Sequence, residues 1–299
     1  MSTATLTQTG TTATTTPVAP ARDPRRWYTL AVLCLSLLVI VVDTTIVNVA
    51  IPTLARSLHA GPGALAWIVD SYTLVFAALL LPAGSLGDRY GRHRALATGM
   101  LVFGAGSLGA ALAGNATELI AMRAIMGIGA AFIMPATMAV LTAVFTDPAE
   151  RAKAIGLWSA VSGLGVAIGP TAGGWLLQHY SWSAIFAVNL PIVAVALVAG
   201  LFLVPASKAP HRPRLDPLGT VLATAGLGAL TYAVIQAGQS GWGSAGSLLR
   251  FGVAIALLAG FAVAQLRNDH PMLDLSLFRD GRFTAATVAV MVLFFGLAG

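Results

Sequence analysis

The sequence predicts an all-α membrane protein, and three observations lead to this fold class. Of its 299 residues, 57% are hydrophobic and only 9% are charged. The mean hydropathy of +0.82 lies outside the range of water-soluble domains. The apolar residues form nine segments of about 20 residues each, the length at which a helix crosses a bilayer. These segments are apolar all round, whereas the strands of a membrane barrel alternate polar and apolar residues, so helices are predicted.

The nine predicted spans follow one another with short polar connections. They cover residues 27–50, 65–86, 95–113, 119–145, 154–177, 184–204, 218–237, 248–266 and 283–299. The 26 residues before them are rich in Thr and Ala and have no long apolar core followed by a small-residue cleavage site. We therefore expect residues 1–26 to be a disordered cytosolic tail and not a signal peptide.

The distribution of positive charge predicts the topology. With the N-terminus in the cytosol, 14 of the 17 Lys and Arg residues fall in segments on the cytosolic side. Two more, Arg56 and Arg250, fall outside, and Arg123 falls within a span. Because Lys and Arg are enriched in cytoplasmic loops, this bias favours a multi-pass protein of the cell membrane with a cytosolic N-terminus. It also explains the net charge of +6 without a nucleic-acid partner.

Two polar connections divide the chain. The first is "VPASKAPHRPRLDP" (204–217), and the second is "RNDHPMLDLSLFRDGR" (267–282), where we expect a short interfacial helix. They predict a six-span half (27–204), a cytosolic linker with two extra spans (205–266), and a loop with the first span of an incomplete second half (267–299). The sequence stops inside an apolar run, so we expect a fragment of a longer reading frame.

The sequence gives no support for catalysis, a cofactor or a metal. The five histidines lack metal-ligand spacing, and neither H-E-x-x-H nor G-x-S-x-G occurs. The segment "GAGSLG" (104–109) matches a dinucleotide-binding pattern, but it lies in the middle of a span, where close helix packing explains it better. We therefore predict no catalytic residues, no metal site and no cofactor.

Three charged side chains lie clearly within the predicted spans: Asp43, Asp70 and Arg123. A charge at the bilayer centre costs about 2.5 to 3.5 kcal/mol, so one that persists usually faces a cavity or a partner. At a rise of 1.5 Å per residue, Asp43 lies about 24 Å from the cytosolic start of span 1. Asp70 and Arg123 lie about 8 Å and 6 Å below the outer starts of spans 2 and 4. All three are therefore expected at similar depth in the outer half of the membrane.

Two functions fit a buried carboxylate of this kind. It can take up and release a proton, with a nearby Arg adjusting its pKa, or it can be the counter-ion of a cationic substrate. Asp43 is the stronger candidate because Thr44, Thr45 and Asn48 lie beside it. The alternatives are a structural ion pair that clamps helices and, for Asp70, a carboxylate that stays hydrated near the interface.

The stretch "GSLGDRYGRHR" (84–94) forms the predicted cytosolic turn between spans 2 and 3. A tight turn explains Gly91, and the topology explains the arginines. Neither explains Asp88, which we expect in a charge network or at the positive end of a helix.

Span 5 contains "SGLGVAIGPTAGGWL" (162–176), in which Gly165, Gly169 and Gly173 recur every four residues. Such a stripe lets another helix approach closely. Pro170 and Gly174 predict a bend. A static packing seam and a helix that flexes and slides against its neighbour both fit this pattern.

These segments resemble signatures of the major facilitator superfamily and, within it, of the fourteen-span drug:proton antiporters. The stretch 84–96 is similar to the loop signature at Gly84, Leu86, Asp88, Arg89, Gly91 and Arg92. "LIAMRAIMGIGAA" (119–131) resembles the span 4 signature R-x-x-q-G through Arg123, Gly127 and Gly129, with Met126 where Gln is usual. "GVAIGPTAGG" resembles the antiporter signature G-x-x-x-G-P-x-x-G-G at Gly165, Gly169, Pro170, Gly173 and Gly174. The segments 42–54 and 182–192 resemble the span 1 signature and the span 6 entry of the same branch.

The resemblance implies a major facilitator fold with an N-terminal half of inverted three-helix repeats, two linking helices at 218–266 and the first helix of a second half at 283–299. It implies export of hydrophobic, often cationic drugs or antibiotics in exchange for protons, so the partners are that substrate, protons and the lipid bilayer. In the family, the loop Asp and Arg hold one conformation by contacting the opposite half, a role that falls to Asp88, Arg89 and Arg92. The span 4 Arg, here Arg123, is linked to proton coupling.

Two other functions stay open. One is an exporter dedicated to a single metabolite of the same cell, and the other is a non-transporting membrane scaffold or sensor. A scaffold function does not explain why Asp43 and Arg123 lie at similar depth in the membrane. Alternating access needs a site between two halves, so we expect that these 299 residues alone do not transport.

Overall fold

The computed structural model describes residues 25–205, 216–268, 273 and 275–298, and within these ranges the regular structure is helical. The helices are α1 (Arg26–Ser57), α2 (Pro62–Tyr90), α3 (Arg92–Ala111), α4 (Ala116–Val144), α5 (Pro148–His179), α6 (Ala184–Ala187), α7 (Asn189–Leu203), α8 (Pro217–Ser240), α9 (Ala245–Arg267), the 3₁₀-helix η1 (Leu275–Arg279) and α10 (Gly281–Ala298). The prediction of a disordered tail falls almost wholly on residues 1–24, outside the described ranges, as does most of the basic connection at 206–215.

The helices confirm the predicted order of spans. Eight helical segments among the described residues are long and apolar enough to cross a membrane, with α6 and α7 together forming one of them. The ninth predicted span falls on α10, whose described apolar part, Gly281–Val292, is shorter than a membrane crossing, so a ninth crossing stays a prediction. The second polar connection contains the short helix η1. The architecture is that of an all-α membrane protein.

Several helices begin earlier than their apolar runs because polar side chains cap them. The Asn115 side chain accepts a hydrogen bond from the Glu118 backbone N–H at 2.9 Å, at the start of α4. Asp147 accepts from the N–H groups of Ala149 and Glu150, both at 3.0 Å, at the start of α5. The first backbone amides of a helix have no partner within it, so such caps fix where it begins. For this reason α5 starts at Pro148 instead of the predicted 154.

The predicted sixth span is confirmed as one membrane-length segment, Ala184–Leu203, and its helix is interrupted once. α6 ends at Ala187 and α7 begins at Asn189, with Val188 between them. Pro191 has no backbone N–H, so it cannot donate to the carbonyl of Ala187, four residues earlier. The break places Asn189 at the start of α7, inside the protein.

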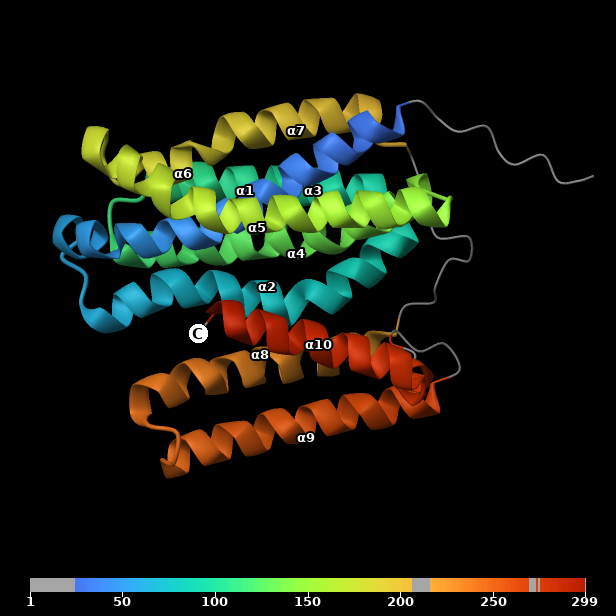
Figure 1. Cartoon of the computed structure of the whole chain (residues 1–299). Coiled ribbons are helices and arrows are strands. Elements are labelled where there is room, and N and C mark those ends of the chain that lie inside the picture. Colours follow the sequence, from blue (N-terminus) through green and yellow to red (C-terminus); the bar gives the residue numbers. More distant parts are fainter. Residues whose placement is uncertain (1–24, 206–215, 269–272, 274, 299) are drawn as a thin grey trace, which may run out of the picture.

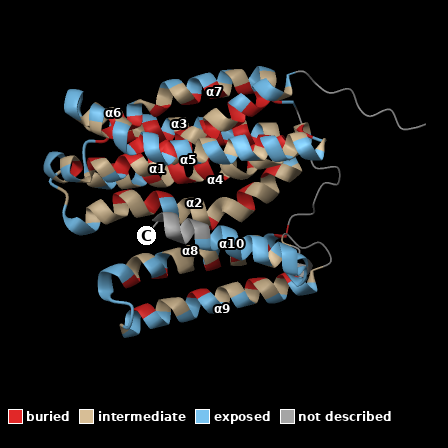
Figure 2. Ribbon diagram, in the orientation of Figure 1, coloured by how far each residue is buried: buried red, intermediate tan, exposed pale blue. Residues whose placement is uncertain are grey.

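α1, α3 and α4 form the centre of a first bundle, defined here as α1 to α7. α4 packs along both α2 and α3, and α1 packs along α5. α8 and α9 pack on each other, and α8 contacts α2 (Figure 1). The central helices are more buried than the outer ones: 61% of the most apolar stretch of α1 is buried, but only 17% of that of α5 or α9. Figure 2 shows the resulting contrast between red central helices and pale blue outer ones.

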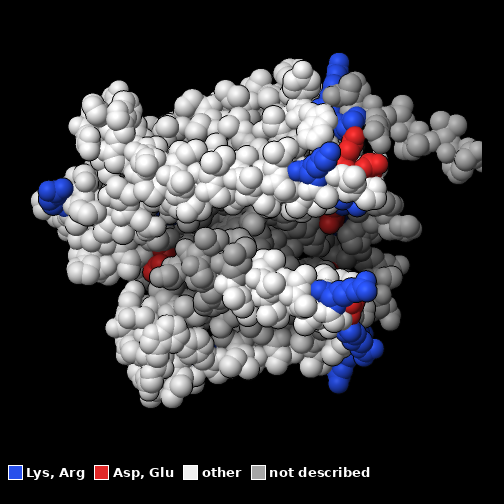
Figure 3. Space-filling model, viewed as in Figure 1, with Lys and Arg blue, Asp and Glu red and all other residues white. Residues whose placement is uncertain are grey.

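Positive side chains gather at one end of the helices. On the face in Figure 3, nearly all visible Lys and Arg side chains lie at one end, and the long sides of the helices show almost none. Figure 1 places the start of α1 and the end of α9 at that end. The helices therefore pass back and forth between a basic end and a weakly charged one, as the predicted alternation of loops requires.

A buried polar junction joins the bases of α8 and α9. Asp216 caps α8 by accepting from the Gly219 N–H at 2.9 Å, and its other oxygen accepts from Nε2 of Gln265 at 2.6 Å. Gln265 in turn accepts from the Leu273 N–H at 3.1 Å, on the way to η1. Burial acts to raise the pKa of Asp216, but the hydrogen bonds from Gly219 and Gln265 outweigh it, and the pKa falls below its ordinary value.

We expect the Asp216→Ala variant to destabilise the start of α8 by about 1 kcal/mol, the usual cost of losing a cap. Because the folded-state pKa of Asp216 is lowered, its contribution is complete above the unfolded-state pKa and is lost as the pH falls through the folded-state value. Hydrogen exchange of the first turn of α8 should therefore accelerate below about pH 4 in the wild type and lose this pH dependence in the variant. As a control, Asp147→Ala should loosen the start of α5 and leave α8 unchanged. Equal exchange in wild type and Asp216→Ala would contradict the prediction.

Candidate functional site: a buried ion pair in the first bundle

The structure brings together two of the three intramembrane charges. Nη1 of Arg123 on α4 lies 2.5 Å from Oδ2 of Asp43 on α1, and their side chains are 1% and 0% exposed. Arg123 Nε also donates to the Ile68 carbonyl of α2 at 3.0 Å. The guanidinium lies over the Tyr72 ring, with 4.3 Å between its carbon and the ring centroid. The Asp43–Arg123 pair therefore lies where α1, α2 and α4 meet.

Glycines on α4 allow the close packing that places Arg123. A Cβ added at Gly127 would lie 2.6 Å from the Tyr72 carbonyl oxygen of α2, and one at Gly129 would lie 2.7 Å from the Gly99 carbonyl oxygen of α3. Both distances are too short for a real side chain. The two glycines matched in the span 4 signature thus let α4 lie directly against both neighbours, which holds Arg123 at the depth of Asp43.

Two further polar residues complete the cluster, and sequence reasoning did not assign them. Asn189 Nδ2 donates to Oδ1 of Asp43 at 3.0 Å and to Oγ of Ser107 at 3.1 Å. Ser107 on α3 donates to the Phe186 carbonyl of α6 at 2.8 Å. Asn189 and Ser107 are both 0% exposed. The sequence feature that could have indicated Asn189 is an Asn two residues before Pro191, in an apolar span and within the segment that resembles the span 6 entry.

This arrangement surrounds the buried carboxyl group of Asp43 with hydrogen-bond donors. Both Asp43 oxygens are hydrogen-bonded, one to a cation and one to an amide, so the ionised form has partners. A buried ion pair adds little net stability, because desolvation offsets the attraction, whereas removing one partner costs about 3 to 5 kcal/mol. The cluster is thus sensitive to the charge of each member, including the change that a proton on Asp43 would cause.

Asp70 and Asn48 lie apart from the ion pair. Asp70 is half-buried on α2, and within the described ranges its carboxylate has no hydrogen bond or ion pair. Asn48 is exposed on α1 and donates only to the Thr44 carbonyl of its own helix, at 3.4 Å. A role for Asp70 or Asn48 in proton or substrate binding stays a prediction.

The stretch 84–94 is the end of α2 and the start of α3, and the predicted turn between them is the single residue Gly91. An ion pair spans this turn. Arg92 Nε lies 2.8 Å from Asp88 Oδ1, and Arg92 Nη1 donates to the Ala139 carbonyl near the end of α4 at 3.0 Å. Gly91 has φ = 119°, a backbone conformation that favours glycine. Asp88 therefore has a partner across its own turn, and Arg92 joins that turn to α4.

Gly84 faces Pro135 at ordinary contact distance, and the Arg89 guanidinium carbon lies 5.8 Å from the centroid of the Tyr90 ring. A contact between this turn and an opposite half remains a prediction.

The glycine stripe of α5 packs against α1, which bears Asp43. A Cβ at Gly165 would lie 2.9 Å from Val41, and one at Gly173 would lie 2.7 Å from Ile46. A Cβ at Gly169 would overlap the Thr45 side chain. Gly174 has open space beside it, and α5 continues as one helix through Pro170. The predicted close approach is confirmed for the three glycines spaced four apart.

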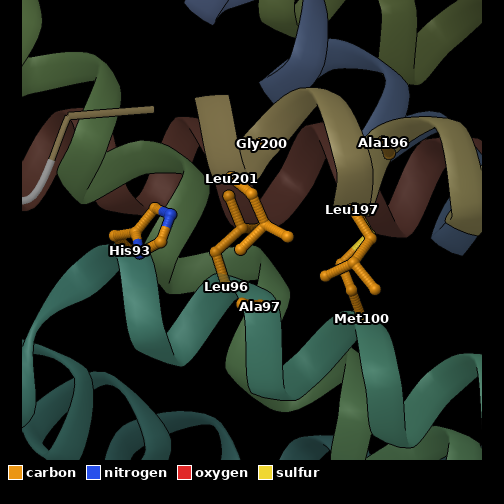
Figure 4. Close-up of a pocket in the computed structure, with 8 residues that line it drawn as sticks. All are labelled: His93, Leu96, Ala97, Met100, Ala196, Leu197, Gly200 and Leu201. Carbon is orange, nitrogen blue, oxygen red and sulfur yellow. The ribbon is translucent and has the colours of Figure 1, made fainter. Parts of the chain in front are cut away.

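The crevice in Figure 4 is not a drug-sized site. It lies between α3 and α7 and is lined by apolar side chains such as Met100 and Leu197, with His93 at one end. Its volume is about 10 Å³, room for roughly one water molecule. Small-molecule sites usually enclose several hundred Å³. Among the described residues there is also no cluster of His, Cys, Asp and Glu that could hold a metal.

The fold and the buried charges define a polytopic membrane protein with an ionisable centre. Residues 33–299 match the family model of the Major Facilitator Superfamily, and the chain belongs to this family of transporters, which are not enzymes. It also resembles the solved structure of the POT family transporter PepTSo, with a TM-score of 0.59 and 18% identity over 83% of this chain and 55% of that one. That likeness supports the fold alone.

Three relatives illustrate the sequence similarity. The multidrug efflux pump LfrA of Mycolicibacterium smegmatis is 39% identical over 284 residues, covering 95% of this chain and 56% of that protein. The methyl viologen resistance protein SmvA of Salmonella typhimurium is 36% identical, covering 92% and 56%. The tetracenomycin C resistance and export protein of Streptomyces glaucescens is 33% identical, covering 95% and 53%. The chain thus spans about half the length of these relatives.

Proposed function

We propose that the protein to which these residues belong is a proton-coupled exporter of the fourteen-span drug:proton antiporter branch. It moves hydrophobic, often cationic compounds across the cytoplasmic membrane by alternating access, with its N-terminus in the cytosol. The Asp43–Arg123 pair carries this proposal, because a carboxylate whose charge controls a buried cluster can link protonation to helix packing. Relatives named for multidrug efflux and methyl viologen resistance support the substrate class.

A dedicated exporter of one endogenous compound is the second candidate. A relative that is named for both resistance to and export of tetracenomycin C favours it. Both candidates use the same Asp43–Arg123 pair and differ in the substrate site. Measuring export of a panel of unrelated cationic and neutral compounds separates them, since a dedicated exporter transports only one chemical class.

In everted membrane vesicles containing the complete reading frame, we expect Asp43→Asn to abolish export of a hydrophobic cation such as ethidium driven by a pH gradient. Asn has a similar shape but takes up no proton, so coupling is lost. Substrate counterflow, which needs no proton gradient, should persist and thereby show that the variant is folded. Asp216→Asn is the matched control, because it makes the same change at a cap far from the cluster and should export normally.

The same assay tests the other predicted carboxylate through Asp70→Asn. Membrane amounts are measured by immunoblot so that rates are compared per molecule. If Asp43→Asn exports at the wild-type rate under a pH gradient, Asp43 is not the coupling group. A scaffold or sensor would show no pH-driven export in any variant, including the wild type.

A further inference from the structure

Among the described residues, only one of the two polar atoms of the Asn189 side-chain amide forms hydrogen bonds. Its nitrogen donates to both Asp43 and Ser107, but its oxygen Oδ1 is buried and has no hydrogen-bond partner within the described ranges. A buried acceptor without a partner costs about 1 to 3 kcal/mol. Native proteins retain few such atoms, and each one calls for a physical reason.

The reason lies in the two faces of an amide. An ionised carboxylate only accepts hydrogen bonds, so the present orientation, with Nδ2 toward Asp43, fits charged Asp43. The reverse orientation would place Oδ1 against a carboxylate oxygen, and the two would repel. A protonated Asp43 has an O–H to donate, which the Asn189 nitrogen cannot accept. Turning the amide by half a revolution would present the now unpartnered Oδ1 to that O–H.

Ser107 can follow the same turn. At present its hydroxyl accepts from Asn189 and donates to the Phe186 carbonyl. A hydroxyl hydrogen rotates freely, so with Oδ1 facing it Ser107 can donate to Asn189 instead. The Phe186 carbonyl would then lose the Ser107 hydroxyl and keep the Val188 N–H as a donor. Phe186 lies in α6, just before the break at Val188, where Pro191 already weakens the helix.

We propose that Asn189 is a positioning residue whose amide turns when Asp43 gains a proton, and that Ser107 passes this turn to the backbone at the α6–α7 break. The inference rests on the proposed function, since it needs Asp43 to be protonated during transport. Arg123 of α4 and Tyr72 of α2 are the charged and titratable side chains of the cluster, whereas Asn189 and Ser107 do not titrate. α5 presents the glycine stripe to α1 at this level.

The turn can be observed in these 299 residues reconstituted in lipid nanodiscs. Selective ¹⁵N labelling of asparagine gives few side-chain amide signals, because the sequence has Asn only at 48, 115, 189 and 268. Asn189→Leu assigns the Asn189 signal. Infrared spectra of the same sample report the band of a protonated carboxyl group, and Asp43→Asn assigns its Asp43 part.

We expect the Asn189 signal to shift over the pH range in which the Asp43 carboxyl band appears, and to stay constant with pH in Asp43→Asn. If the Asp43 band appears while the Asn189 signal stays constant, the proposed turn of the Asn189 amide is overturned and the proposed function stands. If the Asp43 band never appears and Asp43→Asn exports normally, the proposed function and the proposed turn both fail.

The proposed step from Asn189 through Ser107 to the α6–α7 break is tested separately by Ser107→Ala in the complete reading frame. We expect proton-driven export to fall about fivefold, the effect of one lost hydrogen bond of about 1 kcal/mol, while counterflow is kept. Ser36→Ala is the matched control, since Ser36 is equally buried but donates only to Val32 of its own helix. Equal export rates in the Ser107→Ala and Ser36→Ala variants would overturn this step.

Discussion

Replacing Arg123 with Met is expected to lower the free energy of unfolding by about 3 to 5 kcal/mol, because the variant leaves the Asp43 carboxylate buried without its counter-charge. Met fills a similar volume, so the loss measures charge pairing more than packing. Equilibrium unfolding of the chain in mixed micelles of lipid and denaturing detergent measures the change.

The control is the double variant Asp43→Leu/Arg123→Met, which removes both charges. Replacing a buried ion pair with apolar residues of similar volume is often neutral or stabilising, so the double variant should recover most of the loss. If Arg123→Met and the double variant are equally unstable, the loss comes from packing of the Arg123 side chain and not from an unpaired carboxylate.

The single variants are also expected to differ from each other. Without the Asp43 charge, Arg123 keeps the Ile68 carbonyl and the Tyr72 ring as partners. Without Arg123, the remaining partner of Asp43 among the described residues is the Asn189 amide. Asp43→Asn should therefore be clearly milder than Arg123→Met in unfolding experiments, which is why it is the better variant for testing proton coupling.

The sequence predicted how deep each charged residue lies in the membrane, but not toward which neighbouring helix its side chain points. Counting residues along each span placed Asp43 and Arg123 at one level, and the structure shows in addition that their side chains form an ion pair. The same counting placed Asp70 at that level, yet within the described ranges Asp70 forms no hydrogen bond or ion pair with Asp43 or Arg123. A rise per residue gives position along a helix axis, whereas the side on which a residue lies depends on how the helices pack. In spans that are apolar all round, little in the pattern marks the inner side.

Asn189 and Ser107 were missed for a related reason. A single Ser or Asn in an apolar helix commonly bonds to its own backbone, as Ser36 does with Val32. Only the tertiary fold shows that Ser107 and Asn189 instead reach another helix. Pro191 removes one backbone hydrogen bond, but a proline alone does not predict the α6–α7 break, because α5 continues as one helix through Pro170.

Gly169→Ala should lower the free energy of unfolding by about 1 to 3 kcal/mol, the usual cost of overpacking. The new methyl group would overlap the Thr45 side chain and lie 2.9 Å from its Cβ and 3.2 Å from the Val42 carbonyl oxygen. Thr45 cannot turn aside easily, because it is β-branched and bonds to the carbonyls of Val41 and Val42. α5 must therefore move away from α1 beside Asp43, and proton-driven export should fall as well.

Gly174→Ala is the matched control on the same helix, since a Cβ at Gly174 meets no atom within 4 Å. Alanine favours a helix over glycine by about 0.5 to 1 kcal/mol, so this variant should be neutral or more stable. Adding Thr45→Ala to Gly169→Ala removes the overlapping hydroxyl group but keeps the Thr45 Cβ, and should recover part of the loss. If Gly169→Ala is as stable as Gly174→Ala, the stripe is not a tight seam. If Gly169→Ala loses export without losing stability, the closeness of α5 to α1 serves movement and not packing.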